Sequence, residues 1–346
     1  MVTTPLDQHN VLGSIDLLSQ QISQAWHDVS ALQLPADYSD IDQVVVFGMG
    51  GSALGADIIR TAFADTARVP ILIENNYTIP AYVHQRTLAI LSSYSGTTEE
   101  TLTVAKAIKQ RTNKVAIITT GGALQELHQQ AGYPAYLITP TYNPCGQPRI
   151  AVGYAIIGLL GLLHHAKVLT ITNSLIDDVV HYLDGNRELL RDDAKQLAQR
   201  VTGHIPLFVG SEFLIGNLHT VSNQTNENGK NFSTYFTIPE LNHHLLEGLS
   251  FPASAKQLLH MVLIESALYH ERNQKRYVVT KQVLDKNEVQ YSSFIATANT
   301  TLLQVFEVLQ WGSYISFYLA MANQVDPALI PWVDYFKHAL TQVRAA

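Results

Sequence analysis

An α/β architecture with two doubly wound units, each a parallel sheet flanked by helices, is predicted for this chain. In the first half, short runs rich in Val and Ile alternate with helical stretches, as in parallel strands that are buried on both faces. The second half begins with a comparable strand, glycine turn and helix. A length of 346 residues allows about two domains, and we expect them to span residues 1–170 and 171–346.

The first unit is expected to begin with a helix and then to alternate strands with helices. Leu12, Ile15 and Leu18 lie at helical spacing within the first 35 residues. The apolar run at 149–165 predicts a buried helix that closes the unit. Strands are predicted at residues 44–47, 69–73, 88–91, 115–118 and 133–138, and helices at 52–63 and 98–108.

The second unit is expected to follow an amphipathic stretch at 172–200, which is rich in Asp, Arg, Gln and Leu and long enough to bridge two domains. Its first strand begins near Ile205 and runs into a glycine turn. Further strands are predicted at 234–238, 277–280 and 289–295, and two closing helices at 300–322 and 331–343.

Composition and charge limit the possible classes of function. With 47% hydrophobic residues, the chain is not of the disordered class. The 22 basic residues are outnumbered by 29 acidic ones, and the net charge of -7 argues against a nucleic-acid binder. Cys145 is the single cysteine, which excludes an intramolecular disulfide and favours a reducing compartment. Neither a signal-peptide pattern nor an apolar run of about 20 residues is present, so we expect a cytoplasmic protein without a membrane partner.

A glycine-rich segment, GMGGSALG at 48–55, follows the first predicted strand and opens a helix. Amides at a helix N-terminus favour an anion, and Gly51 and Ser52 offer a close backbone approach and a hydroxyl for a phosphate. The segment also partly matches the dinucleotide fingerprint, with Glu74 as a candidate ribose ligand. A tight turn that binds nothing is the third interpretation, and this segment alone does not decide between them.

A hydroxyl-rich turn, SSYSGTTEET at 92–101, follows another predicted strand and opens another helix. Ser93, Ser95 and Thr98 can each donate a hydrogen bond to a phosphate oxygen, and Gly96 allows close backbone approach. Helix capping by Thr98 is the structural alternative, but a cap needs only one hydroxyl. Because a dinucleotide enzyme needs no second phosphate cradle here, the turn favours a sugar monophosphate.

Taken together, the motifs resemble those of a known family. GMGGSALG, SSYSGTTEET, TTGG at 119–122 and QPR at 147–149 are similar to motifs of the sugar isomerase (SIS) domain, and more narrowly of the bifunctional phosphoglucose/phosphomannose isomerases. QTNENGK at 224–230, PELNH at 239–243 and VDYFK at 333–337 continue the resemblance in family order. The resemblance implies two SIS domains, each with a five-stranded parallel sheet, and usually a homodimer.

The resemblance also implies catalytic roles for four residues. Glu227 matches the glutamate that transfers a proton between C1 and C2, and Arg149 matches the arginine beside the enediolate. His243 matches the histidine of ring opening, which tends to come from the partner subunit, and Lys337 matches a C-terminal active-site lysine. Without the resemblance, these residues also allow purely structural interpretations. Glu227 could pair with Lys230 on the surface, His243 could pack against or cap a helix, and Lys337 could be a solvated lysine.

The predicted function is therefore the isomerisation of a sugar 6-phosphate, chiefly glucose 6-phosphate to fructose 6-phosphate, with mannose 6-phosphate as a second candidate substrate. The resemblance implies that mannose-active members use a threonine near the C-terminal lysine, and residues 321–336 contain neither Ser nor Thr. No metal or other cofactor is expected, because no metal-ligand motif is present. The alternatives are a non-catalytic SIS-type regulator that binds a sugar phosphate, and a nucleotide-dependent dehydrogenase.

Overall fold

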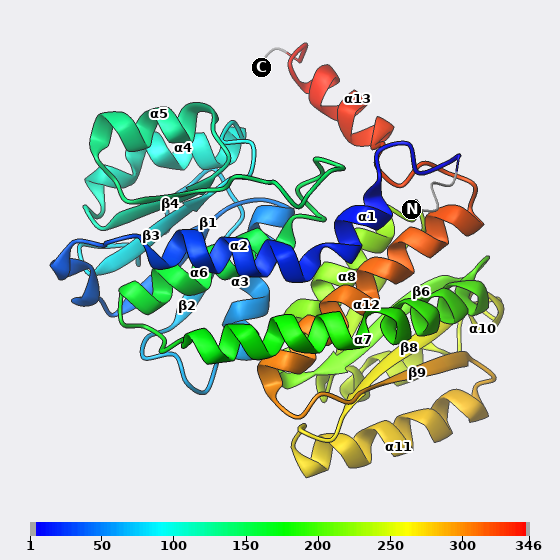
Figure 1. The fold of residues 1–346 in the computed structure, drawn as a ribbon. Coiled ribbons are helices and arrows are strands. Elements are labelled where there is room, and N and C mark those ends of the chain that lie inside the picture. The colour runs from blue at the N-terminus through cyan, green and yellow to red at the C-terminus, as the bar shows by residue number, and fades with distance from the viewer. Residues whose placement is uncertain (1–4, 344–346) are drawn as a thin grey trace.

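The computed structural model describes residues 5–343 and contains two parallel sheets that helices cover and connect (Figure 1). The strands of the first sheet follow the order β2-β1-β3-β4-β5, which is typical of doubly wound folds. These strands are β1 Gln43–Phe47, β2 Ile71–Glu74, β3 Thr87–Ser92, β4 Val115–Thr119 and β5 Ala135–Leu137.

Successive residues of these strands enter two different cores, which explains why the runs are apolar throughout. Val44 and Val46 belong to one core with residues of the helices at 18–30, 51–62 and 152–165. Val45 and Phe47 belong to a second core with the helices at 99–107 and 122–131. The helices of the first half are α1 Val11–Asp16, α2 Leu18–Ser30, η1 Ala36–Ser39, α3 Gly51–Ala62, α4 Glu99–Ala107, η2 Ile108–Gln110, α5 Gly122–Ala131 and α6 Val152–His165.

The second sheet repeats the order of the first sheet's first four strands, as β7-β6-β8-β9. All of its pairings are parallel. Its strands are β6 Ile205–Ser211, β7 Thr234–Ile238, β8 Leu259–Ser266 and β9 Gln290–Ala296. The shared order agrees with the similar openings of the two halves in the sequence.

Two long helices, α7 Asn173–Val201 and α12 Thr301–Ala322, pack against each other (Figure 1). α12 also contacts β9 of the second sheet, and α7 contacts α2 of the first half. Thr172 and Thr300 cap their N-termini by accepting from the amides of Leu175 and Leu303. The other helices of this half are η3 Glu212–Leu214, α8 Ile215–Glu227, η4 Glu240–His243, α9 Leu245–Gly248, α10 Ala255–Leu258, α11 Glu271–Lys286 and α13 Pro331–Leu340.

Three details differ from the expectations. The strand predicted at 277–280 is wrong, because Tyr277, Thr280 and Leu284 are buried at helical spacing within α11. Strand β8 was not predicted. The second sheet has four strands among residues 5–343, whereas the resemblance implies five.

The domain boundary at residues 170 and 171 lies just before α7 and stays a prediction.

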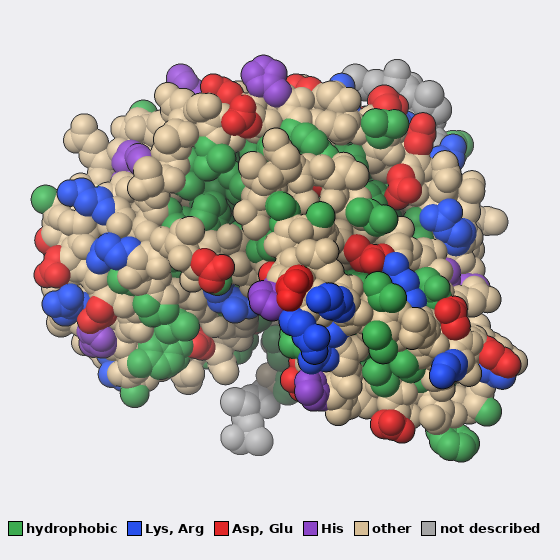
Figure 2. All heavy atoms as spheres, turned by 90° about the horizontal axis from the view of Figure 1, so that it is seen from below, with side chains coloured by type: hydrophobic (Ala, Val, Ile, Leu, Met, Phe, Trp, Pro, Cys, Tyr) green, Lys and Arg blue, Asp and Glu red, His purple; other side chains and the backbone are tan. Residues whose placement is uncertain are grey.

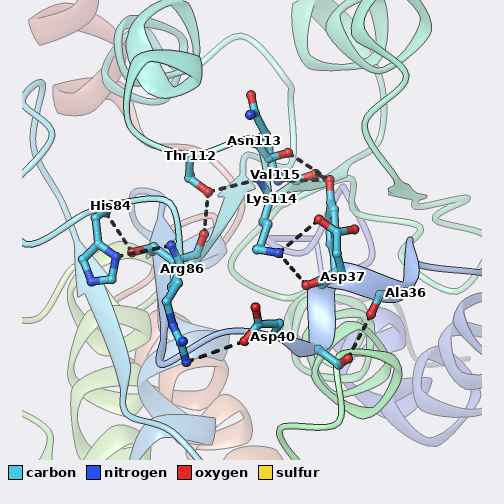
Figure 3. Close-up of polar contacts among 12 residues, drawn as sticks. Ala36, Asp37, Asp40, His84, Arg86, Thr112, Asn113, Lys114 and Val115 are labelled. Carbon is cyan, nitrogen blue, oxygen red and sulfur yellow. Dashed lines mark hydrogen bonds and ion pairs between the residues drawn. The ribbon is translucent and has the colours of Figure 1, made fainter.

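The amino ends of β3 and β4 are closed by polar contacts within the chain (Figure 3). The Lys114 ammonium donates to the carbonyl and the carboxylate of Asp37, at 2.5 and 3.0 Å. The Thr112 hydroxyl donates to the carbonyl of Thr87 at 2.8 Å. This edge of the first sheet is therefore occupied by the protein's own side chains.

Acidic and basic side chains are interspersed over the face seen from below, and the outline of the molecule narrows between its two halves (Figure 2). The mixture agrees with a moderate net charge of -7 rather than with a basic surface. Within residues 5–343, no helix combines the length and apolarity needed to cross a bilayer.

Candidate active site

The two predicted phosphate-binding loops lie at the carboxyl ends of neighbouring strands. β1 leads through Gly48 into α3, and β3 leads through residues 93–98 into α4. In the order β2-β1-β3, the connection from β1 leads to β2 on one side, and the next connection crosses to β3 on the other side. The carboxyl ends of β1 and β3 therefore flank the switch point at which doubly wound sheets bind ligands.

Ser52 joins the two loops. Its hydroxyl oxygen accepts from the Tyr94 amide at 2.9 Å, and its carbonyl accepts from the Ser92 hydroxyl at 3.0 Å. A hydroxyl that accepts in this way keeps its own proton free to donate. A cavity of about 10 Å³ beneath the loops is lined by these three residues and Gly51, among others, which is about the space of one water. This cavity is too small to hold a sugar phosphate.

The hydroxyls of the second loop fall into two groups. Ser93 is buried, accepts from the Gly96 amide at 3.1 Å, and lies 2.7 Å from the Thr98 hydroxyl. These contacts shape the turn. Ser95 is exposed and accepts from both the amide and the hydroxyl of Thr97, which leaves its own proton available to a ligand.

Gly51 and Gly96 are required by backbone packing between these loops and their neighbours. Gly96 has a positive φ of 69°, and a Cβ there would lie 1.8 Å from the carbonyl oxygen of Gly121. A Cβ on Gly51 would lie 3.0 Å from the carbonyl oxygen of Pro148. At Gly50, by contrast, a Cβ would meet nothing within 4 Å. The open backbone approach is therefore at Gly50, while Gly51 and Gly96 bring neighbouring loops together.

Gly96→Ala is expected to lower the free energy of unfolding by about 3 kcal/mol or more, because strain at positive φ adds to a clash with Gly121. Gly132→Ala is the matched control, since Gly132 has a φ of 70° and a Cβ there would meet nothing within 4 Å. It should lose only about 1–2 kcal/mol. Urea unfolding followed by circular dichroism measures both. Equal losses would show that Gly96 is not held against Gly121.

Arg149 lies just before α6 and reaches across to the second half of the chain. Its side chain is 3% exposed, and its guanidinium donates to the carbonyls of Pro327 and Ala328 at 3.0 and 2.7 Å. Gln147 and Asn228 accept two further hydrogen bonds through their side-chain oxygens. Four acceptors thus fix the orientation of one buried cation.

Glu227, the last residue of α8, is the anion beside this cation. One of its carboxylate oxygens lies 3.6 Å from Nη1 of Arg149, and its side chain is 33% exposed. Burial lowers the pKa of Arg149 from its ordinary value, and the Glu227 carboxylate opposes that shift. The pair sets a partly open carboxylate against a rigid positive charge, which suits proton transfer at a carbon whose neighbouring oxygen becomes negative.

The other two predicted catalytic residues lie elsewhere on the surface. His243 is exposed at the end of η4, and Lys337 is exposed on α13, which stands apart from both sheets (Figure 1). Within residues 5–343, no hydrogen bond or ion pair joins either of them to Arg149 or Glu227. The structure therefore brings together two of the four.

Several partners of Arg149 were not singled out from the sequence. Asn228 follows Glu227 in QTNENGK, and Gln147 precedes Arg149 in QPR, so these motifs contained the signal. The carbonyls of Pro327 and Ala328 carry no signal in residue types. Among residues 5–343, no group of three or more His, Cys, Asp or Glu side chains is placed to hold a metal ion.

Comparison with known proteins identifies the family. The chain is 31% identical to a bifunctional phosphoglucose/phosphomannose isomerase of Caldicellulosiruptor bescii over 96% of this chain and 99% of that protein. The chain belongs to this isomerase family. Another isomerase of the same name, from Aquifex aeolicus, is 26% identical over 91% of this chain and 94% of its own. Sequence profiles of the family agree: the SIS domain matches residues 37–159, and the bacterial phospho-glucose isomerase C-terminal SIS domain matches 190–340.

Solved structures share the fold of this isomerase family member at low sequence identity. A hypothetical protein from Thermus thermophilus superposes with a TM-score of 0.74 at 16% identity, covering 97% of this chain and 91% of that chain. A tagatose-6-phosphate ketose/aldose isomerase from Escherichia coli superposes with a TM-score of 0.72 at 15% identity, covering 93% and 96%. The predicted two-unit α/β architecture is thus confirmed.

Proposed function

We propose that the chain is an aldose–ketose isomerase that converts glucose 6-phosphate to fructose 6-phosphate. The Glu227 carboxylate takes the proton from C2 of the open-chain aldose and returns it to C1 of the enediolate, while the hydroxyl proton of the C2 oxygen passes to the C1 oxygen. Arg149 stabilises the negative oxygen of that intermediate. The loops at Ser52 and 93–98 bind the phosphate through neutral donors and helix N-termini.

The observation that carries the proposal is the pairing of Glu227 with Arg149. The two residues come from different halves of the chain, and the buried guanidinium is held by four acceptors besides the carboxylate. A surface pair of Glu227 with Lys230 is the competing reading, but the Lys230 ammonium donates instead to the carbonyls of Asn228 and Asp326. A regulator that only binds a sugar phosphate has no need of this pair.

Ring opening is assigned to His243 of a partner subunit in a homodimer. His243 is exposed, and the segment that follows it exposes Phe251 and Leu258, which are 81% and 47% accessible. Apolar side chains of this size favour burial in an interface.

Lys337 stays a candidate site residue on α13. With Cys145 buried and free, the cytoplasm is the proposed compartment.

A coupled assay with purified protein tests the function, with glucose 6-phosphate and mannose 6-phosphate as separate substrates. We expect turnover of the glucose ester, and slower turnover of the mannose ester because residues 321–336 offer no hydroxyl from Ser or Thr. Binding of sugar phosphates without turnover would instead indicate the regulator, and reduction of a nicotinamide cofactor the dehydrogenase.

Ser95→Ala is expected to raise the Michaelis constant for the sugar phosphate by about tenfold or more, because a hydrogen bond to a charged group is lost. Thr103→Ala is the matched control, since its hydroxyl donates only to the Glu99 carbonyl within α4. Steady-state kinetics on both variants measure the difference. An unchanged Michaelis constant in Ser95→Ala would remove this loop from the phosphate site.

A further inference from the structure

Lys230 has an unusual backbone for a residue with a side chain. It follows α8 and Gly229 with a φ of 47°, in the left-handed region that glycine adopts without strain. Strained residues of this kind persist only where the surrounding structure holds them in that conformation. Glycine would adopt this φ with less strain, so the turn itself does not explain the lysine.

The side chain of Lys230 connects the two segments that form the Arg149 site. Its half-buried ammonium group donates to the carbonyl of Asp326 at 2.6 Å and to that of Asn228 at 3.3 Å. Asn228 adjoins Glu227, while Asp326 adjoins the Pro327 and Ala328 carbonyls that hold the Arg149 guanidinium. The lysine thereby ties the segment of the carboxylate to the segment that orients the arginine.

The charged form of Lys230 is disfavoured in the folded protein, which lowers the free energy of unfolding. Burial, and then the like charge of Arg149, lower the pKa of Lys230 to about 8, while Asp326 and Glu227 oppose the shift. His9 also lies there, with Nδ1 3.4 Å from the Asp326 carboxylate. The neighbouring Arg149 is further influenced by Asp334 and Cys145. Lysine titrates readily in such surroundings, and costly charges of this kind are concentrated at functional sites.

We propose that Lys230 is a positioning residue of the isomerase site, where its charged amine holds the 326–328 segment against Asn228 and so fixes Arg149 relative to Glu227. The inference rests on the proposed function and deepens it. Loss of the amine lets the carbonyls of Pro327 and Ala328 move, and a small displacement of a site group lowers the rate of the chemical step more than it weakens substrate binding.

Three variants test this role. Lys230→Met removes the charge and the donors, Lys230→Gly also relieves the backbone strain, and Lys230→Arg keeps donors and charge at every accessible pH. We expect Lys230→Met and Lys230→Gly to lower kcat by about tenfold or more at pH 7, with KM nearly unchanged. The wild-type kcat should fall as pH rises through about 8, and Lys230→Arg should recover part of the lost kcat without that fall.

Stability as a function of pH supplies an independent readout. Because folding lowers the pKa of Lys230, the unfolded chain binds more protons between about 8 and the ordinary lysine value of 10.5. The wild type should therefore gain stability relative to Lys230→Met as pH rises through that window. Below pH 8, Lys230→Gly should be at least as stable as the wild type, because it removes both the buried charge and the backbone strain.

The outcomes separate the proposals. Unchanged kcat in the folded Met and Gly variants, or the same alkaline fall in Lys230→Arg, would overturn the role of Lys230. A loss of kcat explained wholly by unfolding of both variants would make Lys230 a structural residue and also overturn it. Absence of turnover in the wild type would instead refute the proposed function, and the stability profiles would still report whether Lys230 carries the buried charge.

Discussion

Glu227→Gln is expected to lower kcat by about a hundredfold or more while leaving the binding of a competitive inhibitor nearly unchanged. The amide keeps the shape of the side chain and an oxygen that can face Arg149, 3.6 Å away in the wild type, but it cannot take a proton from carbon. Because Arg149 is held by four acceptors other than Glu227, its position should survive the substitution.

Glu271→Gln is the matched control for that experiment. Glu271 begins α11, its side chain is 74% exposed, and it pairs only loosely with Lys275 at 3.7 Å. The control removes the same charge far from the paired Arg149 and should leave kcat unchanged. Near-normal turnover in Glu227→Gln would mean that another group is the base. The assignment of proton transfer at this position would then be wrong.

The first sheet is largely predictable from sequence because each strand is an apolar run bounded by turn residues. Both faces are buried, so the run does not alternate and is easily recognised, as at Val44 to Phe47. The second sheet is harder. Strand β8 begins with Leu259 and His260 directly after α10, without a glycine or proline to mark its start. The short run at Tyr277 has strand-forming residues, but tertiary burial along α11 decides in favour of a helix.

The candidate site also has a part that is predictable from sequence and a part that is not. The phosphate loops are local features, and their hydroxyls and glycines are predictable because a strand, a turn and a helix start follow one another in sequence. The partners of Arg149 depend on tertiary contact: Asn228 and the carbonyls of Pro327 and Ala328 come from distant segments. Every residue type has a backbone carbonyl, so the sequence cannot show which carbonyls accept hydrogen bonds from Arg149. Only the folded structure shows that the guanidinium is held in one orientation.

Whether His243 acts in the active site of its own chain or of a partner subunit can also be tested. This histidine follows Glu227 by 16 positions and is exposed beyond strand β7. Five residues of strand span about 16 Å, so β7 leads the chain away from the carboxylate. A two-fold interface resolves the separation if each His243 enters the neighbouring site. Glu227→Gln and His243→Ala proteins should then each be inactive alone.

Mixing these two inactive proteins should restore about a quarter of the wild-type activity per chain, because random exchange makes half of the dimers mixed and each mixed dimer has one intact site. In that site, Glu227 comes from one chain and His243 from the other. Glu227→Gln mixed with Arg149→Lys is the control: these residues lie 3.6 Å apart within one chain, so each site of a mixed dimer keeps a defect. If labelled subunits exchange and only background activity returns, His243 serves its own chain or takes no part in the reaction.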